Sequence, residues 1–386
     1  MANRFVLNEI SYHGAGAIEE IGAESTGRGY KKAFVCSDPD LVKFGVTKKV
    51  LDVLEKAGIA YDLYSNIKPN PTVENVKTGV AAFKQSKADY IVAIGGGSSM
   101  DTAKAIGIII ANPDFEDVVS LEGVAPTKNK SVPIFAVPTT AGTAAEVTIN
   151  YVITDARKNR KMVCVDPKDI PVVAFVDSDR MSTMPKGLTA ATGMDALTHA
   201  VEAYIGRSTT YHTRRDALHA VQLIFENIDT VYADGRNVNA RRDMLHASFY
   251  AGCAFTKSYV GYVHAVAHSL GGEYNVPHGL ANAIILPMIL ESYGKCIHKK
   301  LHKLAIAAGI ADKKMSDAEA AERFISAIKD MKHRFDIPDT IPEIKQEDIP
   351  RLARYADKEA NPLYPVPVLM NASELELFYE SLMQIN

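Results

Sequence analysis

The chain gathers histidines in one stretch of its C-terminal half, where residues 264–278 hold three of its 11 histidines. His264 and His268 are four positions apart, so a helix would present both on one face. His278 follows a Gly-Gly pair and a proline, residues that are typical of a turn. Imidazole is a common ligand of transition-metal ions, so this stretch predicts a metal site and leaves open which histidines bind the metal.

A second pair of candidate ligands precedes it in GMDALTHAVEAY (193–204), where Asp195 and His199 are also four positions apart. One such pair on an alanine-rich helix is more often part of a packed core. Two pairs and a further histidine in the same half of the chain favour a shared metal site. Carboxylate and imidazole ligands without a thiolate suit Fe²⁺, Zn²⁺, Mn²⁺ and Ni²⁺ alike, so the ligand types do not identify the ion.

The residues around these histidines disfavour two other kinds of metal site. Zinc hydrolases with an H-E-x-x-H helix carry a glutamate directly after the first histidine, where it acts as the general base. Residue 265 is an alanine in this chain. The four cysteines are widely spaced, form no C-x-x-C pair and are expected to be reduced thiols, so a cysteine-built site is not expected either.

A glycine-rich loop in the first half of the chain could bind phosphate. The segment IVAIGGGSSMDTAKA (91–105) predicts a buried strand, a loop over residues 95–98, and a helix. Glycines let a backbone approach a phosphate closely, and a helix N-terminus offers free N–H groups to an anion. Met100 stands where the G-x-G-x-x-G fingerprint has its last glycine, and no Walker lysine follows. A tight strand-to-helix turn is the alternative, but the strand–loop–helix order favours pyrophosphate binding.

Two further segments support a nucleotide site. The segment PTTAGTAAEVT (138–148) follows a predicted strand, and Thr139, Thr140 and Thr143 could hydrogen-bond phosphates or a nicotinamide amide. The alternative is a threonine-rich loop that caps a helix. Asp38 lies at the polar end of another predicted strand, where a carboxylate can accept from a ribose 2′-OH and repel a 2′-phosphate. That position favours NAD over NADP, although an aspartate there is more often a helix cap.

These loops lie in a half of the chain where strands and helices alternate. Helical apolar spacing over 46–58 and 72–86 separates runs rich in β-branched residues. The predicted strands cover residues 31–38, 59–64, 89–97, 131–140 and 171–177. Such alternation predicts an α/β domain with a parallel, doubly wound sheet, which we place at residues 1–184.

The pattern changes near residue 185. The following residues are rich in Ala, Leu and His at helical spacing, and segments such as 316–334 continue that spacing. We therefore predict an all-helical domain over residues 185–386 that carries the candidate metal ligands. A cleft between the two domains is the expected place for the active site.

Composition excludes several classes of protein. With 386 residues, 47% of them hydrophobic, the chain can form the cores of two domains. Its net charge of −3 argues against nucleic-acid binding. No apolar run approaches the about 20 residues that span a bilayer, and the N-terminus lacks an apolar signal segment. We therefore expect a cytoplasmic protein that does not interact with a membrane.

Four segments together resemble the iron-dependent (group III) alcohol dehydrogenase family, and the resemblance covers nearly the whole chain. They are GGGSSMDTAKA, PTTAGTAAEVT, ATGMDALTHAVEAY and GYVHAVAHSLGGEYNVPHGLANAI, of which the last is long and specific. The resemblance implies a dehydroquinate synthase-like fold, with an α/β nucleotide-binding domain and a helical metal-binding domain. Within the family, the opening MANRFVLNE and the run TINYVITD…KMVCVDPKDIP resemble enzymes that interconvert lactaldehyde and 1,2-propanediol.

The resemblance also implies a role for individual residues. One divalent metal, Fe²⁺ before Zn²⁺ or another ion, would be held by Asp195, His199, His264 and His278. His268 would be a catalytic residue near the nicotinamide and not a ligand, and Phe255 would line the substrate pocket. NAD(H) would be bound by Asp38 and Asn70 at the adenosine, by Gly96, Gly97 and Ser98 at the pyrophosphate, and by Thr139, Thr140, Thr143 and Lys161 around the ribose and nicotinamide.

The expected function is reversible hydride transfer between NAD(H) and a small primary alcohol or 1,2-diol, with the corresponding aldehyde as the other partner. Dehydrogenases of 1,3-propanediol or short-chain alcohols share the metal motif and are the alternative within the family. Zinc-dependent polyol dehydrogenases of the larger superfamily are a more distant alternative. From other classes, the alternatives are a metal-dependent hydrolase or lyase that binds a nucleotide without redox, and a nucleotide sensor without catalysis. A homodimer is expected, in which residues 4–12 form a strand paired across the dimer.

Overall fold

The computed structural model describes residues 2–383, which fold as two compact units, Ala2–Met184 and a second unit that starts at Pro185. Strands and helices alternate in the first unit. In the second unit, helices are the only regular elements among the described residues. The predicted fold, an α/β domain with a parallel sheet and a helical C-terminal domain, is therefore confirmed.

A parallel sheet organises the first unit. Its strands pair in the order β1-β8-β5-β4-β2-β3, and each pair of neighbours is parallel. The strands are β1 (Ile10–His13), β2 (Lys32–Cys36), β3 (Ala60–Tyr64), β4 (Tyr90–Gly95), β5 (Ile134–Pro138) and β8 (Val173–Val176). Strands β4, β5 and β8 are buried along their whole length, as expected for parallel strands that are covered on both faces.

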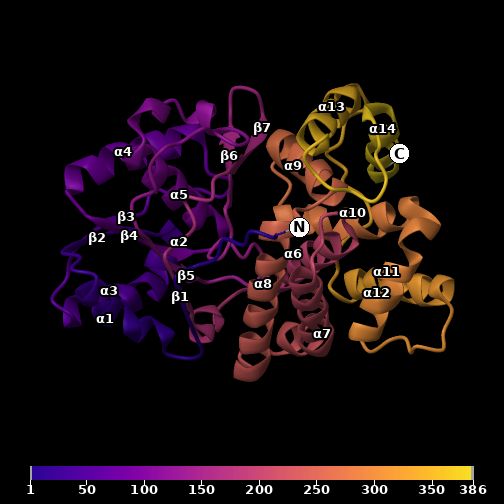
Figure 1. Ribbon diagram of the computed structural model, residues 1–386, viewed down its shortest axis with the longest axis horizontal. Helices are drawn as coiled ribbons and strands as arrows, with labels where there is room; N and C mark the ends of the chain where they lie inside the picture. Colours follow the sequence, from indigo (N-terminus) through magenta and orange to yellow (C-terminus); the bar gives the residue numbers. More distant parts are fainter. Residues whose placement is uncertain (1, 384–386) are drawn as a thin grey trace. The chain divides into compact units, whose positions relative to one another are not determined.

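Helices cover both faces of this sheet (Figure 1). The helices of this unit are α1 (Ile21–Gly27), α2 (Pro39–Lys43), α3 (Val46–Lys56), α4 (Val73–Ser86) and α5 (Gly97–Ala111), with the 3₁₀ helices η1 (Ala17–Glu20), η2 (Pro113–Phe115), η3 (Val118–Leu121) and η4 (Ser178–Met181). Successive strand residues point to opposite faces, so Phe34 of β2 packs with α4 and α5 while Val35 packs with α1 and α3. This is a doubly wound arrangement.

An antiparallel hairpin, β6 (Asn150–Asp155) and β7 (Arg160–Val165), is an element of this unit that the predicted strands did not include. The backbone N–H of Val152 donates to Oδ2 of Asp101 at 3.1 Å, which joins the hairpin to the first turns of α5. Alternating apolar residues on either side of the polar run 157–159 are the signal that would have predicted it.

The N-terminal strand is shorter than predicted. Within the segment 4–12 the structure has a strand only from Ile10, and β1 pairs with β8 of the same chain. Ile10 of β1 and the preceding Phe5 and Leu7 are exposed apolar side chains. Strand β1 is also an edge strand of the sheet.

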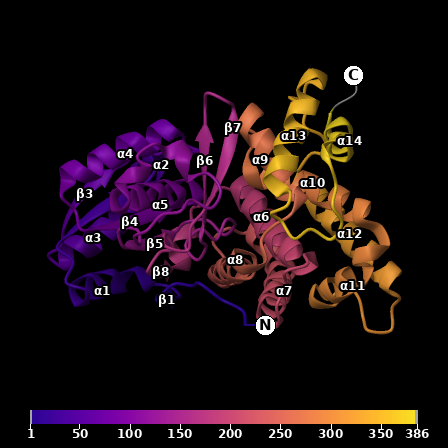
Figure 2. The same ribbon diagram turned by 45° about the horizontal axis from the view of Figure 1, so that its top comes forward.

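The second unit is a set of packed helices (Figure 2). They are α6 (Lys186–Ile205), α7 (Tyr211–Ala233), α8 (Val238–Ser258), α9 (Tyr262–Tyr274), α10 (His278–Tyr293), η5 (Gly294–Ile297), α11 (His298–Ala307), α12 (Asp317–Arg334), η6 (Gln346–Asp348), α13 (Ile349–Ala360) and α14 (Ala372–Leu382). Helix α6 packs against α7, α8 and α10, and α9 packs against α10 and α13. Helices α6, α9 and α10 are largely buried, and they carry the predicted metal ligands.

One helical stretch of the described chain, His278–Ala307, is long and apolar enough to cross a membrane by length and composition alone. Its most apolar window has a mean hydropathy of 1.2, and 61% of that window is buried within the fold. A core helix has these same properties, so the stretch is only weak evidence for a membrane span.

Candidate active site

The predicted metal ligands converge in the helical unit. One donor atom from each of Asp195, His199, His264 and His278 lies within 4.8 Å of the other three. Oδ1 of Asp195 lies 3.5 Å from Nε2 of His278, 3.9 Å from Nε2 of His264 and 4.0 Å from Nδ1 of His199. Bonds of about 2.0–2.1 Å to a tetrahedral metal would separate two ligand atoms by about 3.4 Å. The donor types and their spacing therefore fit one divalent ion.

Three helices supply these donors. Asp195 and His199 lie one turn apart on α6, His264 lies in the first turns of α9, and His278 is the first residue of α10. A side chain at Gly279 would place its Cβ 2.3 Å from the backbone oxygen of Ala191, so a glycine is needed where α10 begins against α6. This close approach brings His278 to the ligands of α6.

The turn between α9 and α10 differs from the prediction. Gly271 and Gly272 are buried inside helix α9 and do not form a turn. The helix ends at Asn275, which has the left-handed backbone conformation with φ of 55°, and Pro277 directly precedes α10. Asparagine tolerates this conformation, so it terminates the helix where a glycine would have been the usual signal.

Glu202 contacts the candidate ligand His264, and sequence reasoning did not identify it. Its Oε2 lies 2.6 Å from Nδ1 of His264, and its two oxygens accept the backbone N–H groups of Gly261 and Val263 at 2.9 Å each. A carboxylate that binds one ring nitrogen leaves the other facing the metal. Glu202 lies seven residues after Asp195 on the same helix, so helical spacing could have revealed it.

The charges around His264 favour a cation at this place. Burial lowers the pKa of His264, but the hydrogen bond and negative charge of Glu202, together with the charge of Asp195, outweigh burial and raise it. The negative charges that stabilise a proton on this ring also attract a metal ion. Because ligand nitrogens must be deprotonated, protons and metal compete for the same atom.

Asn282 is a second residue that sequence reasoning did not identify. It is fully buried on α10, and its Nδ2 donates to Oδ1 of Asp195 at 2.7 Å. The same nitrogen lies 3.3 Å from Nε2 of His264 and 3.2 Å from Nε2 of His278. Asn282 therefore contacts three of the four candidate ligands, one turn after His278 on its helix.

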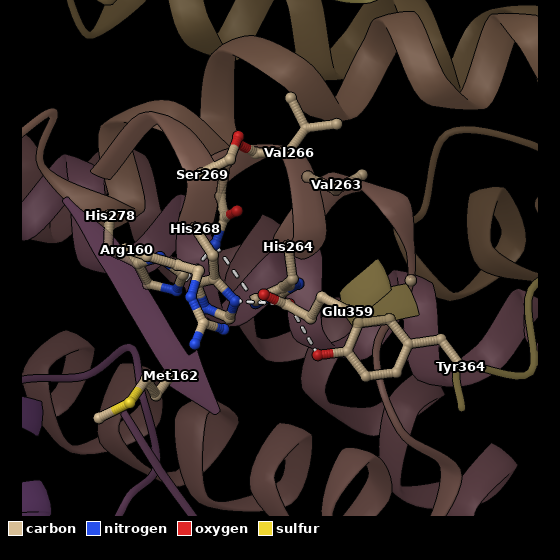
Figure 3. Close-up of polar contacts among 12 residues, drawn as sticks. Arg160, Met162, Val263, His264, Val266, His268, Ser269, His278, Glu359 and Tyr364 are labelled. Carbon is tan, nitrogen blue, oxygen red and sulfur yellow. Dashed lines mark hydrogen bonds and ion pairs between the residues drawn. The ribbon is translucent and has the colours of Figure 1, made fainter. Parts of the chain in front are cut away.

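His268 lies beside the metal ligands but has a different set of partners (Figure 3). Its ring stacks on that of His278, with centroids 5.1 Å apart and planes at 17°. Its Nδ1 lies 2.7 Å from Oε1 of Glu359 on α13. The ring of Phe255 stacks on that of His199, with centroids 4.1 Å apart. His268 and Phe255 thus stack on two of the candidate ligands without being part of the donor cluster.

Several of the predicted nucleotide-binding residues lie at the carboxyl ends of neighbouring strands of the parallel sheet. Asp38 follows β2, Gly96 and the N-terminus of α5 follow β4, and Thr139 follows β5. These three strands are neighbours, so their carboxyl ends lie side by side. Helix α3 after β2 and helix α5 after β4 cover opposite faces of the sheet, and such a switch point is the usual place for a nucleotide in a doubly wound fold.

Two of these loops are in close contact. A Cβ added at Gly97 would lie 2.9 Å from Cγ2 of Thr143, and one at Gly96 would lie 3.2 Å from the side chain of Thr140. The backbone N–H of Thr139 donates to the oxygen of Gly95 at 3.0 Å. Threonine hydroxyls and the free N–H groups at the start of α5 are therefore assembled around one glycine turn, which suits a pyrophosphate.

The remaining predicted cofactor residues lie on separate segments of the first unit. Asp38 is the N-cap of α2, and one of its oxygens accepts the N–H of Leu41 at 2.9 Å. Asn70 lies in the loop after β3 with φ of 53°. Lys161 is a buried residue of β7, and its charge acts on the nearby carboxyl of Asp101. Ser98 lies in the first turn of α5.

Family profiles match both units. A profile described as iron-containing alcohol dehydrogenase matches residues 8–178, and the C-terminal profile of the Fe-containing alcohol dehydrogenase family matches residues 189–383. The chain is 47% identical over 360 residues to the lactaldehyde reductase of Escherichia coli (strain K12), which covers 92% of this chain and 93% of the relative. It is 38% identical over 354 residues to the NAD-dependent methanol dehydrogenase of Bacillus methanolicus, covering 91% of this chain and 92% of that one.

A solved structure supports the same relationship. The crystal structure of a 1,3-propanediol oxidoreductase superposes with a TM-score of 0.93 and is 37% identical, covering 98% of this chain and 99% of that one.

Proposed function

Because the chain belongs to the iron-containing alcohol dehydrogenase family, whose members use NAD(H) and a divalent metal, we propose that it interconverts a small alcohol and its aldehyde, with 1,2-propanediol and lactaldehyde as the favoured pair. The observation that carries this proposal is the Asp/His₃ donor set, three of whose four residues are buried, found in a chain 47% identical to a lactaldehyde reductase. A hydrolase or lyase without redox is not favoured, because the family is one of oxidoreductases.

In this proposal Asp195, His199, His264 and His278 hold one divalent ion, with Fe²⁺ the favoured species. The bound ion supplies Lewis-acid stabilisation of negative charge on the substrate oxygen. Asp195 contributes one negative charge to the donor set, which leaves the loaded site net positive. Asp195, His199 and His264 are buried, which limits the screening of that charge by water.

The proposed NAD(H) site lies at the carboxyl ends of strands β2, β4 and β5. The start of α5 at Gly96, Gly97 and Ser98 binds the pyrophosphate. Asp38 keeps one carboxylate oxygen for the adenosine ribose, which favours NAD over NADP. The other proposed contacts are Asn70 at the adenosine and Thr139, Thr140, Thr143 and Lys161 near the ribose and nicotinamide.

The reaction moves a hydride from the alcohol carbon to NAD⁺ and releases the hydroxyl proton, and the reverse reaction takes both back. We assign the proton to His268, and we assign Phe255 to the substrate pocket because its ring stacks on the ligand His199. Hydride transfer requires the nicotinamide to meet the substrate carbon.

The second candidate substrate is 1,3-propanediol. It is favoured by the likeness to the 1,3-propanediol oxidoreductase structure, which is 37% identical to this chain. The two diols differ only in the position of one hydroxyl, so the residues around Phe255 must discriminate between them.

We further propose a cytoplasmic homodimer. The exposed apolar residues Phe5 and Leu7, which lead into the edge strand β1, would be covered by a second copy. Size-exclusion chromatography with light scattering tests this: the full chain should run as a dimer, and deletion of residues 2–9 should give a monomer. Cell fractionation tests the compartment.

The experiment that tests the function combines metal analysis with a substrate panel. Protein purified without added metal or chelator should contain one iron per chain by elemental analysis. NADH formation or consumption is followed with 1,2-propanediol, lactaldehyde, 1,3-propanediol, ethanol and methanol. The value of kcat/KM for the favoured pair should exceed the others by about tenfold or more. A higher value for 1,3-propanediol would reassign the substrate, and no turnover with any member of the panel would refute the function.

A further inference from the structure

His268 contacts a segment far along the chain. Glu359 lies at the end of α13, 91 positions after His268, and its Oε1 lies 2.7 Å from Nδ1 of the histidine. The same oxygen accepts the hydroxyl of Tyr364 at 2.8 Å. Figure 3 shows the glutamate between the histidine and the tyrosine. Both ends of this chain of contacts are buried, with His268 at 6% and Tyr364 at 7% exposure.

The direction of these hydrogen bonds follows from the donors present. Burial raises the pKa of Tyr364 well above its ordinary value, and the charge of Glu359 raises it further, so the hydroxyl keeps its proton and donates. Glu359 then accepts from the tyrosine and from Nδ1–H of His268. Because a neutral imidazole carries one proton, the lone pair of His268 is left on Nε2.

The segment that carries Glu359 is fixed to α9 at further points. The hydroxyl of Tyr262 on α9 lies 3.0 Å from Oδ1 of Asn361 and accepts the N–H of Met370 at 2.8 Å. Ser269, directly after His268, bonds the hydroxyl of Tyr379 on α14 at 2.6 Å. The carboxylate is therefore held in place by contacts that do not involve His268.

We propose that Glu359, supported by Tyr364, is a positioning residue that holds His268 as its Nδ1–H tautomer, with Nε2 presented to the substrate or the cofactor. This inference rests on the proposed role of His268. The alternative is that the contact of Glu359 with His268 only stabilises the packing of α13 against α9.

A double-mutant cycle separates the two roles. Glu359→Ala should lower kcat/KM by about 10- to 100-fold, the usual effect of removing the partner of an active-site histidine. In a His268→Ala background the same substitution should cost less than about threefold, because Glu359 acts through the ring that is gone. Equal losses in the two backgrounds would overturn the proposal. Loss of metal in Glu359→Ala would also overturn it, because the glutamate would then support the metal site.

Two further variants keep the test decisive. Glu359→Gln preserves the size of the side chain and serves in the same cycle if the alanine variant does not fold. Tyr364→Phe removes only the hydroxyl and should cause a smaller loss that likewise disappears in the His268→Ala background. The matched control is Glu380→Ala, which removes an exposed carboxylate from α14 and should leave kcat/KM unchanged.

A measurement without turnover distinguishes failure of this inference from failure of the proposed function. Zn²⁺-loaded protein labelled with ¹⁵N-histidine is studied by NMR, with the His268 signals assigned from the His268→Ala spectrum. Nδ1 should be protonated and Nε2 unprotonated in the native protein, and this preference should be lost in Glu359→Ala. Protonated Nε2 in the native protein would refute the inference whatever the substrate panel shows.

Discussion

Nδ1 of His264 and Oε2 of Glu202 lie 2.6 Å apart although 62 positions separate them in the chain. The contact joins the start of α9 to the helix that carries Asp195 and His199. The carboxylate also accepts the backbone N–H groups of Gly261 and Val263, so it caps α9 as well as orienting the ring. The candidate ligand on α9 is thereby held in place by contacts with α6.

Glu202→Gln should weaken metal binding by about 10- to 100-fold, because His264 loses the charged partner that fixes its tautomer. Competition with a chromogenic chelator measures this affinity. Glu226→Gln removes an exposed carboxylate from α7 and is the control, for which the affinity should not change. An unchanged affinity in Glu202→Gln would mean that His264 is oriented without Glu202.

His264→Ala and His278→Ala should each lose bound metal and activity together, because each removes one of four donors. His268→Ala should keep the metal and lose rate or cofactor affinity. Elemental analysis of the purified variants, beside NADH turnover, gives both quantities. Full metal occupancy in purified His264→Ala would refute the ligand assignment.

Gly97→Ala should weaken NADH binding by about tenfold, or about 1.4 kcal/mol. Its Cβ would come 2.9 Å from Cγ2 of Thr143, so the threonine must move in the loop that we assign to the cofactor. Fluorescence titration with NADH measures the affinity. Thr143→Ser removes the clashing methyl group and should restore part of the affinity in the double variant. Gly187→Ala, where a Cβ meets no atom within 4 Å, should bind NADH normally.

Stability should fall as the pH rises toward 7 because of Glu146. This side chain is 2% exposed, and burial raises its pKa to about 7 from an ordinary value of 4.5. An acid whose pKa is raised by folding holds its proton more tightly in the folded state, so its contribution is favourable at low pH. That contribution is lost as the pH rises from the unfolded pKa through the folded one.

Glu146→Gln should remove this part of the pH dependence. Between about pH 5 and about pH 8.5, the decline in the free energy of unfolding should be smaller in the variant by on the order of 2–3 kcal/mol. Urea unfolding at the two pH values measures the decline, and the comparison cancels any pH-independent effect of the amide. Glu20→Gln, at an exposed carboxylate, should reproduce the native pH dependence. An identical decline in Glu146→Gln would contradict the raised pKa.

Much of the fold and of the candidate site could be predicted because the sequence patterns that indicate them lie within short segments of the chain. The strand–loop–helix around Gly96 depends on the residues from 91 to 105 alone, and it appears in the structure as β4 followed by α5. The pairs Asp195/His199 and His264/His268 follow from the 3.6-residue period of a helix. The hairpin β6–β7 was not predicted, although its alternating pattern is equally local.

Contacts between distant segments could not be predicted in this way. Glu359 reaches His268 across 91 positions, and no spacing near either residue indicates that contact. Gly271 and Gly272 were misleading because the buried surroundings of α9 tolerate glycines that would otherwise suggest a turn. Asn275 ends that helix instead.

The sequence by itself determined that His264 and His268 share a face of one helix, and only the tertiary structure decided that they have different partners. His264 meets Glu202 of α6 and joins the donor cluster, while His268 meets Glu359 of α13 and stays outside it. The physical reason is that helical spacing sets the direction of a side chain relative to its own axis. The residue that a side chain contacts depends on which other helix packs against that turn of its own helix. That packing is determined by the whole unit.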